Sequence, residues 1–229
     1  MKIINIVFFL LLTVNAYSQL AIVNDADGYV NVRYKADKNS KVVSKLQNNE
    51  IVYCFEPEGN WVNIDFMTKP EDGNGYVYRD RLKYISNFND IKPVGLTENS
   101  VKFIHDSTFI QLVKSKFLSK QNKLSFDKNN GYNFLTKING KSFFGTDGEI
   151  PKFRYKRFLI TIGKDTLKIP ISDYNDLYEP NFNSTYLNYD TRSHRYYLSA
   201  LNSDGAGGYE VVWVFSKEGY IRRYIYYGF

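Results

Sequence analysis

The chain of 229 residues has 30 Lys and Arg against 24 Asp and Glu, with one Cys and two His. One Cys excludes a disulfide within the chain and any multi-cysteine metal site, and two His exclude a three-histidine zinc centre. The aromatic residues number 20 Tyr, 17 Phe and 2 Trp. Because aromatic and β-branched residues dominate the hydrophobic set, we expect an all-β protein that binds a ligand.

Residues 1–18 have the pattern of a secretory signal peptide. Lys2 supplies a positive charge, residues 3–14 are mostly apolar, and the small residues Ala16 and Ser18 precede Gln19 at the positions expected for cleavage. The apolar stretch is shorter than the ~20 residues that span a bilayer. We therefore expect an exported protein, periplasmic or secreted, with no transmembrane anchor after cleavage and no nucleic acid among its partners.

The charge of the expected mature chain is unevenly distributed. Residues 19–92 have 10 basic and 11 acidic residues, whereas residues 93–229 have 19 basic and 13 acidic residues. Between them, residues 87–95 are polar and include Pro93 and Gly95, which is typical of a short linker. The sequence thus predicts a first domain over residues 19–86, a linker over 87–95 and a second domain over 96–229.

The first domain has the pattern of short strands separated by turns. Residues 61–66 alternate most clearly, with Val62, Ile64 and Phe66 on one face and Trp61 on the other. Shorter alternating or apolar segments occur at residues 30–33, 42–43, 51–55 and 76–78. Such closely spaced strands without a helical period predict a small barrel or sandwich.

Four segments of this domain occur in a characteristic order: residues 27–33 (DGYVNVR), 40–43 (SKVV), 59–64 (GNWVNI), and 75–77 (GYV) followed by Arg81-Leu82. In order and spacing they resemble the bacterial SH3-like (SH3b) family over residues 21–85. The resemblance implies a small SH3-like barrel that attaches its protein to cell-wall peptides or glycans.

Four aromatic residues of the first domain are candidates for ligand binding. Trp61, Tyr76 and Tyr78 lie on strand faces opposite the core positions, and Tyr34 lies where a strand meets its loop. Exposed aromatic rings stack on sugar rings or hold short peptides. We therefore expect them to contact ligand; the alternative is that they cover the rim of a barrel too small to bury them.

The second domain contains 26 of the aromatic residues, and we expect most of them to form its core. Hairpins are predicted around residues 163–165 and 216–219, and residues 109–118 are expected to form a strand rather than an amphipathic helix. The expected fold is a larger antiparallel β domain, arranged as a meander, a sandwich or a partial barrel. Residues 202–209 resemble uncharacterised C-terminal domains of exported bacterial proteins, which implies no function.

The residues that commonly carry catalysis are sparse. Cys54 lies between Tyr53 and Phe55 in a predicted strand, where a small core residue is expected rather than a nucleophile. His105 and His194 are far apart in the sequence, and we expect both on the surface or in strands. The loops at Asp147 and Asp204 are expected to form turns; calcium binding there is left open. We predict no catalytic residue, metal site or cofactor.

A basic segment stands out in the second domain. Alternation places Lys152, Arg154 and Lys156 on one strand face and Phe153, Tyr155 and Arg157 on the other. Together with Arg222 and Arg223, the three basic residues of the first face are expected to contact an anionic envelope component. The alternative is a solvated strand face that discourages edge pairing.

These observations favour an exported binding protein over an enzyme. The first domain would dock on cell-wall peptidoglycan or peptide, and the basic second domain would bind another envelope component, such as an envelope protein. Two alternatives stay open. One is a cell-wall hydrolase with a carboxylate-based site in the second domain. The other is an inhibitor or immunity-type protein.

Overall fold

The computed structural model describes residues 19–67, 72–129 and 131–227. In these residues the regular structure consists of β-strands and short 3-10 helices, and every pair of neighbouring strands is antiparallel. The all-β prediction is therefore confirmed. The predicted signal peptide lies outside the described residues. No helix in the described ranges is long and apolar enough to cross a membrane.

The N-terminal sheet has seven strands in the order β3-β2-β6-β5-β4-β1-β7. Their bounds are β1 (Leu20–Val23), β2 (Tyr29–Arg33), β3 (Val42–Gln47), β4 (Ile51–Glu58), β5 (Trp61–Phe66), β6 (Gly73–Tyr78) and β7 (Leu82–Tyr84). The 3-10 helices η1 (Arg79–Arg81) and η2 (Ile85–Asn87) flank β7.

The N-terminal sheet curls around its own core. Alternating residues of β5, beginning with Val62, are buried, as the sequence pattern predicts. Leu46 from edge strand β3 and Leu82 near the other edge belong to the same buried cluster as Val62. In the described residues these edges are not hydrogen-bonded to each other, so the sheet does not close into a barrel.

The rest of the chain builds two five-stranded sheets. The outer sheet has the order β15-β14-β11-β10-β9, and the central sheet has the order β19-β18-β17-β16-β8. The outer strands are β9 (Gly95–Thr97), β10 (Ser100–His105), β11 (Thr108–Lys116), β14 (Phe153–Ile162) and β15 (Asp165–Leu167). The central strands are β8 (Asn89–Ile91), β16 (Thr185–Asp190), β17 (Arg195–Asn202), β18 (Tyr209–Ser216) and β19 (Gly219–Tyr226).

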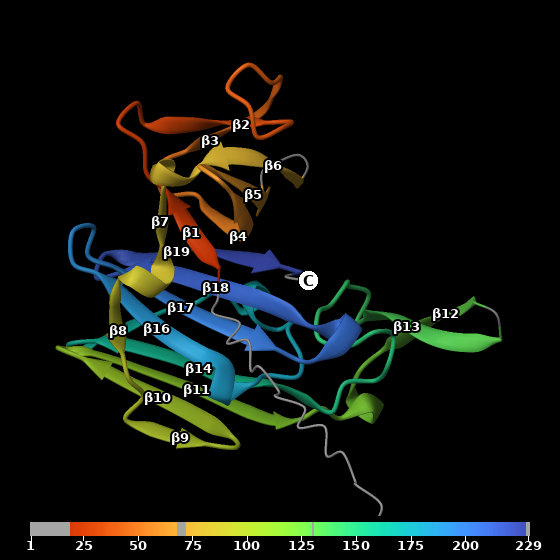
Figure 1. Cartoon of the computed structure of the whole chain (residues 1–229). Coiled ribbons are helices and arrows are strands. Elements are labelled where there is room, and N and C mark those ends of the chain that lie inside the picture. The colour runs from red at the N-terminus through yellow and green to blue at the C-terminus, as the bar shows by residue number, and fades with distance from the viewer. Residues whose placement is uncertain (1–18, 68–71, 130, 228–229) are drawn as a thin grey trace, which may run out of the picture.

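The two five-stranded sheets pack face to face as a sandwich (Figure 1). Its core includes Phe103 from the outer sheet and Trp213 and Phe215 from the central sheet, all fully buried. Most of the large side chains that are fully buried in the described residues are aromatic and come from this sandwich. The second domain's aromatic residues therefore build its core, as predicted.

The central sheet is covered on both faces. All eight residues of β18 are buried. Trp213 points into the sandwich, whereas Val212 and Val214 pack against Leu20, Ile22 and Ile51 of the N-terminal sheet. Tyr226 Oη donates a 2.7 Å hydrogen bond to the Ile51 carbonyl across the same contact. The molecule is therefore three layers of sheet, with the central sheet in the middle (Figure 1).

The segment predicted to link two domains takes part in this layered structure. Within residues 87–95, β8 pairs with β16 as an edge strand of the central sheet. Phe88 stacks on Tyr197 with ring centroids 5.5 Å apart. The chain therefore passes from the N-terminal sheet to the sandwich through paired and packed residues.

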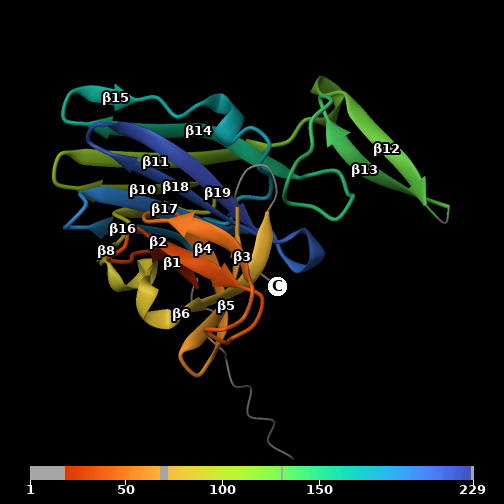
Figure 2. The ribbon, with the colours of Figure 1, turned by 90° about the horizontal axis from the view of Figure 1, so that it is seen from above.

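A two-stranded hairpin projects from one end of the sandwich (Figure 2). It consists of β12 (Leu124–Asn129) and β13 (Tyr132–Ile138). The remaining 3-10 helices lie in connections: η3 (Ser119–Gln121), η4 (Ile171–Asp173), η5 (Phe182–Ser184) and η6 (Gly205–Gly207).

Residues 109–118 largely form β11, so the expected strand is confirmed, as are both predicted hairpins. The alternation predicted for the basic segment is wrong beyond Tyr155. Tyr155 is buried, but Arg157 is exposed rather than on the same face. The cause is a register shift between β11 and β14, which leaves Lys156 without a paired residue and reverses the alternation that follows.

Candidate functional site

Two of the four predicted ligand-binding aromatics form a pair on the outer face of the N-terminal sheet. Trp61 and Tyr78 are directly opposed on β5 and β6. Their rings meet edge to face with centroids 5.1 Å apart. Asn60 Nδ2 donates a 3.0 Å hydrogen bond to Tyr78 Oη and so fixes the tyrosine tip. The pair presents two differently oriented aromatic surfaces to solvent.

The pair borders a hollow of about 260 Å³, which we call the aromatic hollow. Its other walls carry charges of both signs. The lining residues are Asp25, Asp27, Tyr29, Val30, Asn31, Arg33, Lys38, Trp61, Tyr78 and Arg81. Such a site can stack an apolar ring or chain on one side and pair with amino or carboxyl groups on the other.

An ion pair orders the charged wall of the aromatic hollow. Arg81 Nη1 donates to Asp25 Oδ2 at 2.6 Å, and the backbone N–H of Asp27 donates to Asp25 Oδ1 at 2.8 Å. The Asp27 amide is the main cause that lowers the pKa of Asp25, and Arg81 adds to it, while desolvation opposes both. Asp25 therefore stays ionised and holds Arg81 at the edge of the hollow.

This ion pair predicts a pH-dependent stability difference for Asp25→Asn. Because the folded-state pKa of Asp25 lies below its unfolded value, ionised Asp25 stabilises the fold above that unfolded value, about 3.9, and the contribution disappears as pH falls through the folded pKa. Asp25→Asn should therefore lower the melting temperature at pH 7, and the loss should become smaller as pH falls below about 3.9. Asp27→Asn, in the same exposed turn, is the control. If Asp25→Asn lowers the melting temperature equally at pH 7 and well below the unfolded pKa, the folded-state pKa of Asp25 is not lowered by these contacts.

The other two predicted aromatics do not line the aromatic hollow. Tyr76 lies on β6, where it is opposite Asn63 on one side and Arg33 on the other. Tyr34 follows β2 and is 66% exposed. The charged lining residues were not predicted as site residues. The only sequence signal for Asp25 and Asp27 is a turn, Asn24–Gly28, and turns of this composition are common.

The five basic residues predicted to form one anionic-partner surface lie in different places. Lys152 immediately precedes β14 of the outer sheet, Arg154 lies near the start of that strand, and Lys156 lies at its bulge. Arg223 forms a bidentate ion pair with Asp176 at 2.6 and 3.0 Å. Arg222 lies over the ring of Tyr224, 4.3 Å from its centroid, on the side of the central sheet that faces the N-terminal sheet.

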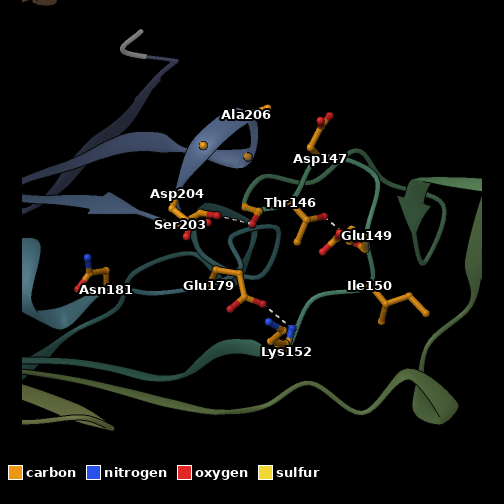
Figure 3. Close-up of a pocket in the computed structure, with 13 residues that line it drawn as sticks. Thr146, Asp147, Glu149, Ile150, Lys152, Glu179, Asn181, Ser203, Asp204 and Ala206 are labelled. Carbon is orange, nitrogen blue, oxygen red and sulfur yellow. Dashed lines mark hydrogen bonds between the residues drawn. The ribbon is translucent and has the colours of Figure 1, made fainter.

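The two Asp-Gly loops singled out in the sequence meet at a second, larger hollow of about 580 Å³ (Figure 3). We call it the loop hollow. Asp147 and Glu149 come from the loop before β14, Asp204 comes from the loop after β17, and Glu179 comes from the loop before η5. No pattern in the sequence predicts that these loops are neighbours.

Tight packing and buried hydrogen bonds hold the loop hollow together. A Cβ atom at Gly207 would lie 2.8 Å from Thr146 Cα, so only glycine allows these two loops to touch. Asn202, fully buried, accepts from the Asn181 backbone at 2.9 Å and donates to Tyr155 Oη at 3.0 Å. Ser203 Oγ donates to the Gly145 carbonyl at 2.8 Å.

The acids around the loop hollow do not form a metal centre. Glu179 Oε1 accepts hydrogen bonds from the backbone N–H groups of Lys152 and Phe153. Asp147, Glu149 and Asp204 are exposed to solvent. Across the described part of the chain, no group of three or more His, Cys, Asp or Glu residues is arranged to hold a metal ion.

The residues considered for nucleophilic chemistry lie elsewhere. Cys54 is fully buried in the N-terminal core, as expected, and burial raises the pKa of its thiol to about 12. Both histidines contact Tyr189: the His105 ring centroid lies 4.7 Å from that of Tyr189, and His194 Nδ1 lies 2.9 Å from Tyr189 Oη. Because the two histidines are far apart along the chain, this shared contact could not be predicted from their spacing.

No protein-family model, no curated protein and no solved structure matches this chain. The assignment of a function therefore rests on the two hollows and on the exposed surfaces of the described residues.

Proposed function

We propose that this chain is an exported, non-enzymatic binding protein. Its N-terminal sheet is an SH3-like module that docks on a cell-wall peptide or glycan through the aromatic hollow. The sandwich would present a second surface to another envelope component. Binding uses aromatic stacking, hydrogen bonds and ion pairs and makes or breaks no covalent bond.

The placement of the resembling segments supports the SH3-like part of the proposal. Residues 30–33 fall in β2, residues 61–64 fall in β5, and Tyr76-Val77 fall in β6. Their inward residues share one core within a single curled sheet. Short, strongly coiled antiparallel strands around one small core are the basis of SH3-like barrels. The order of turns and strands is therefore compatible with such a module.

The aromatic hollow is the main support for the proposed binding function. It joins the Trp61–Tyr78 pair to two carboxylates and three basic side chains within one small concave surface. Cell-wall peptides have amino and carboxyl groups, and the attached glycan offers sugar rings with apolar faces. Carboxylates such as Asp27 pair with amines, guanidinium groups such as Arg33 pair with carboxylates, and aromatic rings stack on sugars.

The loop hollow gives weaker support to a carboxylate-based hydrolase. A general acid in such an enzyme needs a carboxyl group whose pKa is raised by its surroundings, usually by burial. Glu179 is committed to two backbone hydrogen bonds, and Asp147, Glu149 and Asp204 are exposed. The binding function therefore fits the described residues better.

Co-sedimentation of residues 19–229 with purified insoluble peptidoglycan tests the proposal. Trp61→Ala should weaken binding at least about tenfold, because one face of the aromatic hollow is lost. Arg81→Gln should also weaken binding, since it removes a charge from the opposite wall. The matched control is Tyr34→Ala, which removes an exposed aromatic outside the hollow and should bind like the wild type.

Two results would contradict this function. If the unaltered chain does not sediment with peptidoglycan, peptidoglycan is not its ligand. If the unaltered chain and the Trp61→Ala variant bind equally well, the binding surface lies outside the aromatic hollow. Circular dichroism of each variant establishes that a loss of binding does not come from unfolding.

A further inference from the structure

The hairpin β12–β13, which we call the hairpin arm, stands outside the three layers. Both views show it extending past the end of the sandwich (Figures 1 and 2). Its root is packed: Leu135 and Ile138 form a small buried cluster with Phe117 and Tyr178, and one side of the Phe134 ring packs on Gly148. The fold therefore holds the arm firmly at its base and exposes the half nearer the turn.

The exposed half of the hairpin arm has large apolar side chains. Tyr132 is 71% exposed, Phe126 is 45% exposed and Phe134 is 39% exposed. Phe126 pairs with Leu135, whereas Phe134 pairs with Asp127, so Phe126 and Phe134 lie on opposite faces of the hairpin. Aromatic side chains are thus exposed on both faces, which is unusual for a hairpin that packs against another protein surface.

Exposed lysines lie in the hairpin arm and in the segments at its root. Residues 118–141 contain five lysines and one acid, Asp127. The lysines are Lys120, Lys123, Lys128, Lys137 and Lys141, and all five are exposed. The segment therefore has a charge of +4, most of the mature chain's +5 excess. This charge is complementary to a densely anionic surface.

We propose that the hairpin arm binds an anionic lipid bilayer by inserting its aromatic end into the headgroup region. Insertion surrounds both faces of the hairpin with lipid, which accounts for aromatics on both faces. Strands rise about 3.4 Å per residue, so the distance from Phe126 to Asn129, the last residue of β12, is about 10 Å, similar to the depth of interfacial insertion. Lys137 and the lysines at the root would remain at the level of the lipid phosphates, and Lys128, which lies within the inserted stretch, would extend its amine back to them.

This inference does not depend on the aromatic hollow, which belongs to another sheet. It gives the sandwich a partner, the membrane surface, while the N-terminal sheet is left free for its own ligand. The two surfaces therefore predict separate losses: Trp61→Ala should leave lipid binding unchanged, and changes in the hairpin arm should leave peptidoglycan binding unchanged.

The test measures binding of residues 19–229 to sedimenting vesicles. One set contains phosphatidylglycerol and phosphatidylethanolamine, and the other contains phosphatidylcholine alone. We expect binding to the anionic vesicles only. The double variant Phe126→Ser with Tyr132→Ser should reduce the partition coefficient at least about tenfold, and so should Lys128→Glu with Lys137→Glu. Phe134 is left unchanged because it packs on Gly148.

A charge-matched control separates the arm from the general positive charge of the chain. Lys164 and Lys168 are exposed at the β14–β15 hairpin, at the opposite end of the sandwich (Figure 2). Lys164→Glu with Lys168→Glu makes the same change in net charge and should retain most of the binding. An equal loss in both lysine variants would overturn the proposal, because binding would then follow net charge alone.

A tryptophan at position 132 reports insertion directly. In Tyr132→Trp, lipids brominated in the upper acyl chain should quench the new fluorescence, whereas the two native tryptophans, fully buried Trp213 and Trp61 on the N-terminal sheet, should be unaffected. Vesicle binding without quenching would overturn insertion. Absence of binding to either vesicle would also overturn the proposal and leave a protein as the partner of the arm. Circular dichroism shows whether each variant is folded.

Discussion

Replacing Val212 by aspartate is expected to lower the free energy of unfolding by about 3–5 kcal/mol, the effect of an uncompensated buried charge. Val212 is fully buried on the face of β18 that meets the N-terminal sheet. Glu210, two residues earlier, is also buried and lies on the same face of the strand. A second carboxylate would therefore lose its hydration beside an existing one.

Urea unfolding followed by circular dichroism measures this loss. The control is Val94→Asp, which introduces the same charge at a residue that is 60% exposed and should change stability by less than about 0.5 kcal/mol. Similar losses in the two variants would show that the central and N-terminal sheets do not pack together in solution. The unaltered chain should unfold in one transition, because the two parts share a buried cluster.

Trp213→Ala is expected to destabilise the fold by about 3–5 kcal/mol, because it removes the largest side chain of the sandwich core and leaves a cavity. Trp213 is fully buried, and its ring meets those of Tyr155 and Phe158 edge to face, with centroids 5.8 and 4.9 Å away. Its indole N–H donates a 2.8 Å hydrogen bond to the Asp173 carbonyl. The alanine variant loses the packing and this hydrogen bond together.

Two comparisons make this result specific. Trp213→Phe keeps an aromatic ring in the core but cannot donate to Asp173, so its loss should be clearly smaller than that of Trp213→Ala. Trp61→Ala removes the chain's other tryptophan from a partly exposed position and should cost about 1 kcal/mol or less. Circular dichroism is the measurement, since both changes alter fluorescence. Equal destabilisation by Trp61→Ala and Trp213→Ala would contradict the burial assigned here.

Local patterns predicted many of the strands well. The alternation in residues 61–66 correctly separated buried Val62 from the more exposed Trp61. Turn residues correctly located the hairpins formed by β14–β15 and β18–β19. These features depend on neighbours within a few residues, and short-range sterics and the two-residue repeat of a strand are sufficient to specify them.

Features that depend on distant segments were not predicted. The register shift at Lys156 arises from pairing with β11, and it moved Arg157 away from the face expected for it. Arg223 was predicted to be available to a partner, but Asp176, 47 residues away, pairs with it. Trp61 and Tyr78 were both predicted as ligand-binding residues, yet the charged walls beside them come from β2, from the turn before it, from the loop after it and from η1.

By itself, the sequence determined that the chain is all-β, that aromatic residues fill the core of its larger part, and that Cys54 is a core residue. These conclusions follow from composition and alternation, which act along the chain. Only the tertiary structure decided that the central sheet is covered on both faces, that the two Asp-Gly loops share one hollow, and that the hairpin arm stands free. Those arrangements are fixed by burial of apolar surface between distant strands, and a linear pattern does not specify which faces will meet.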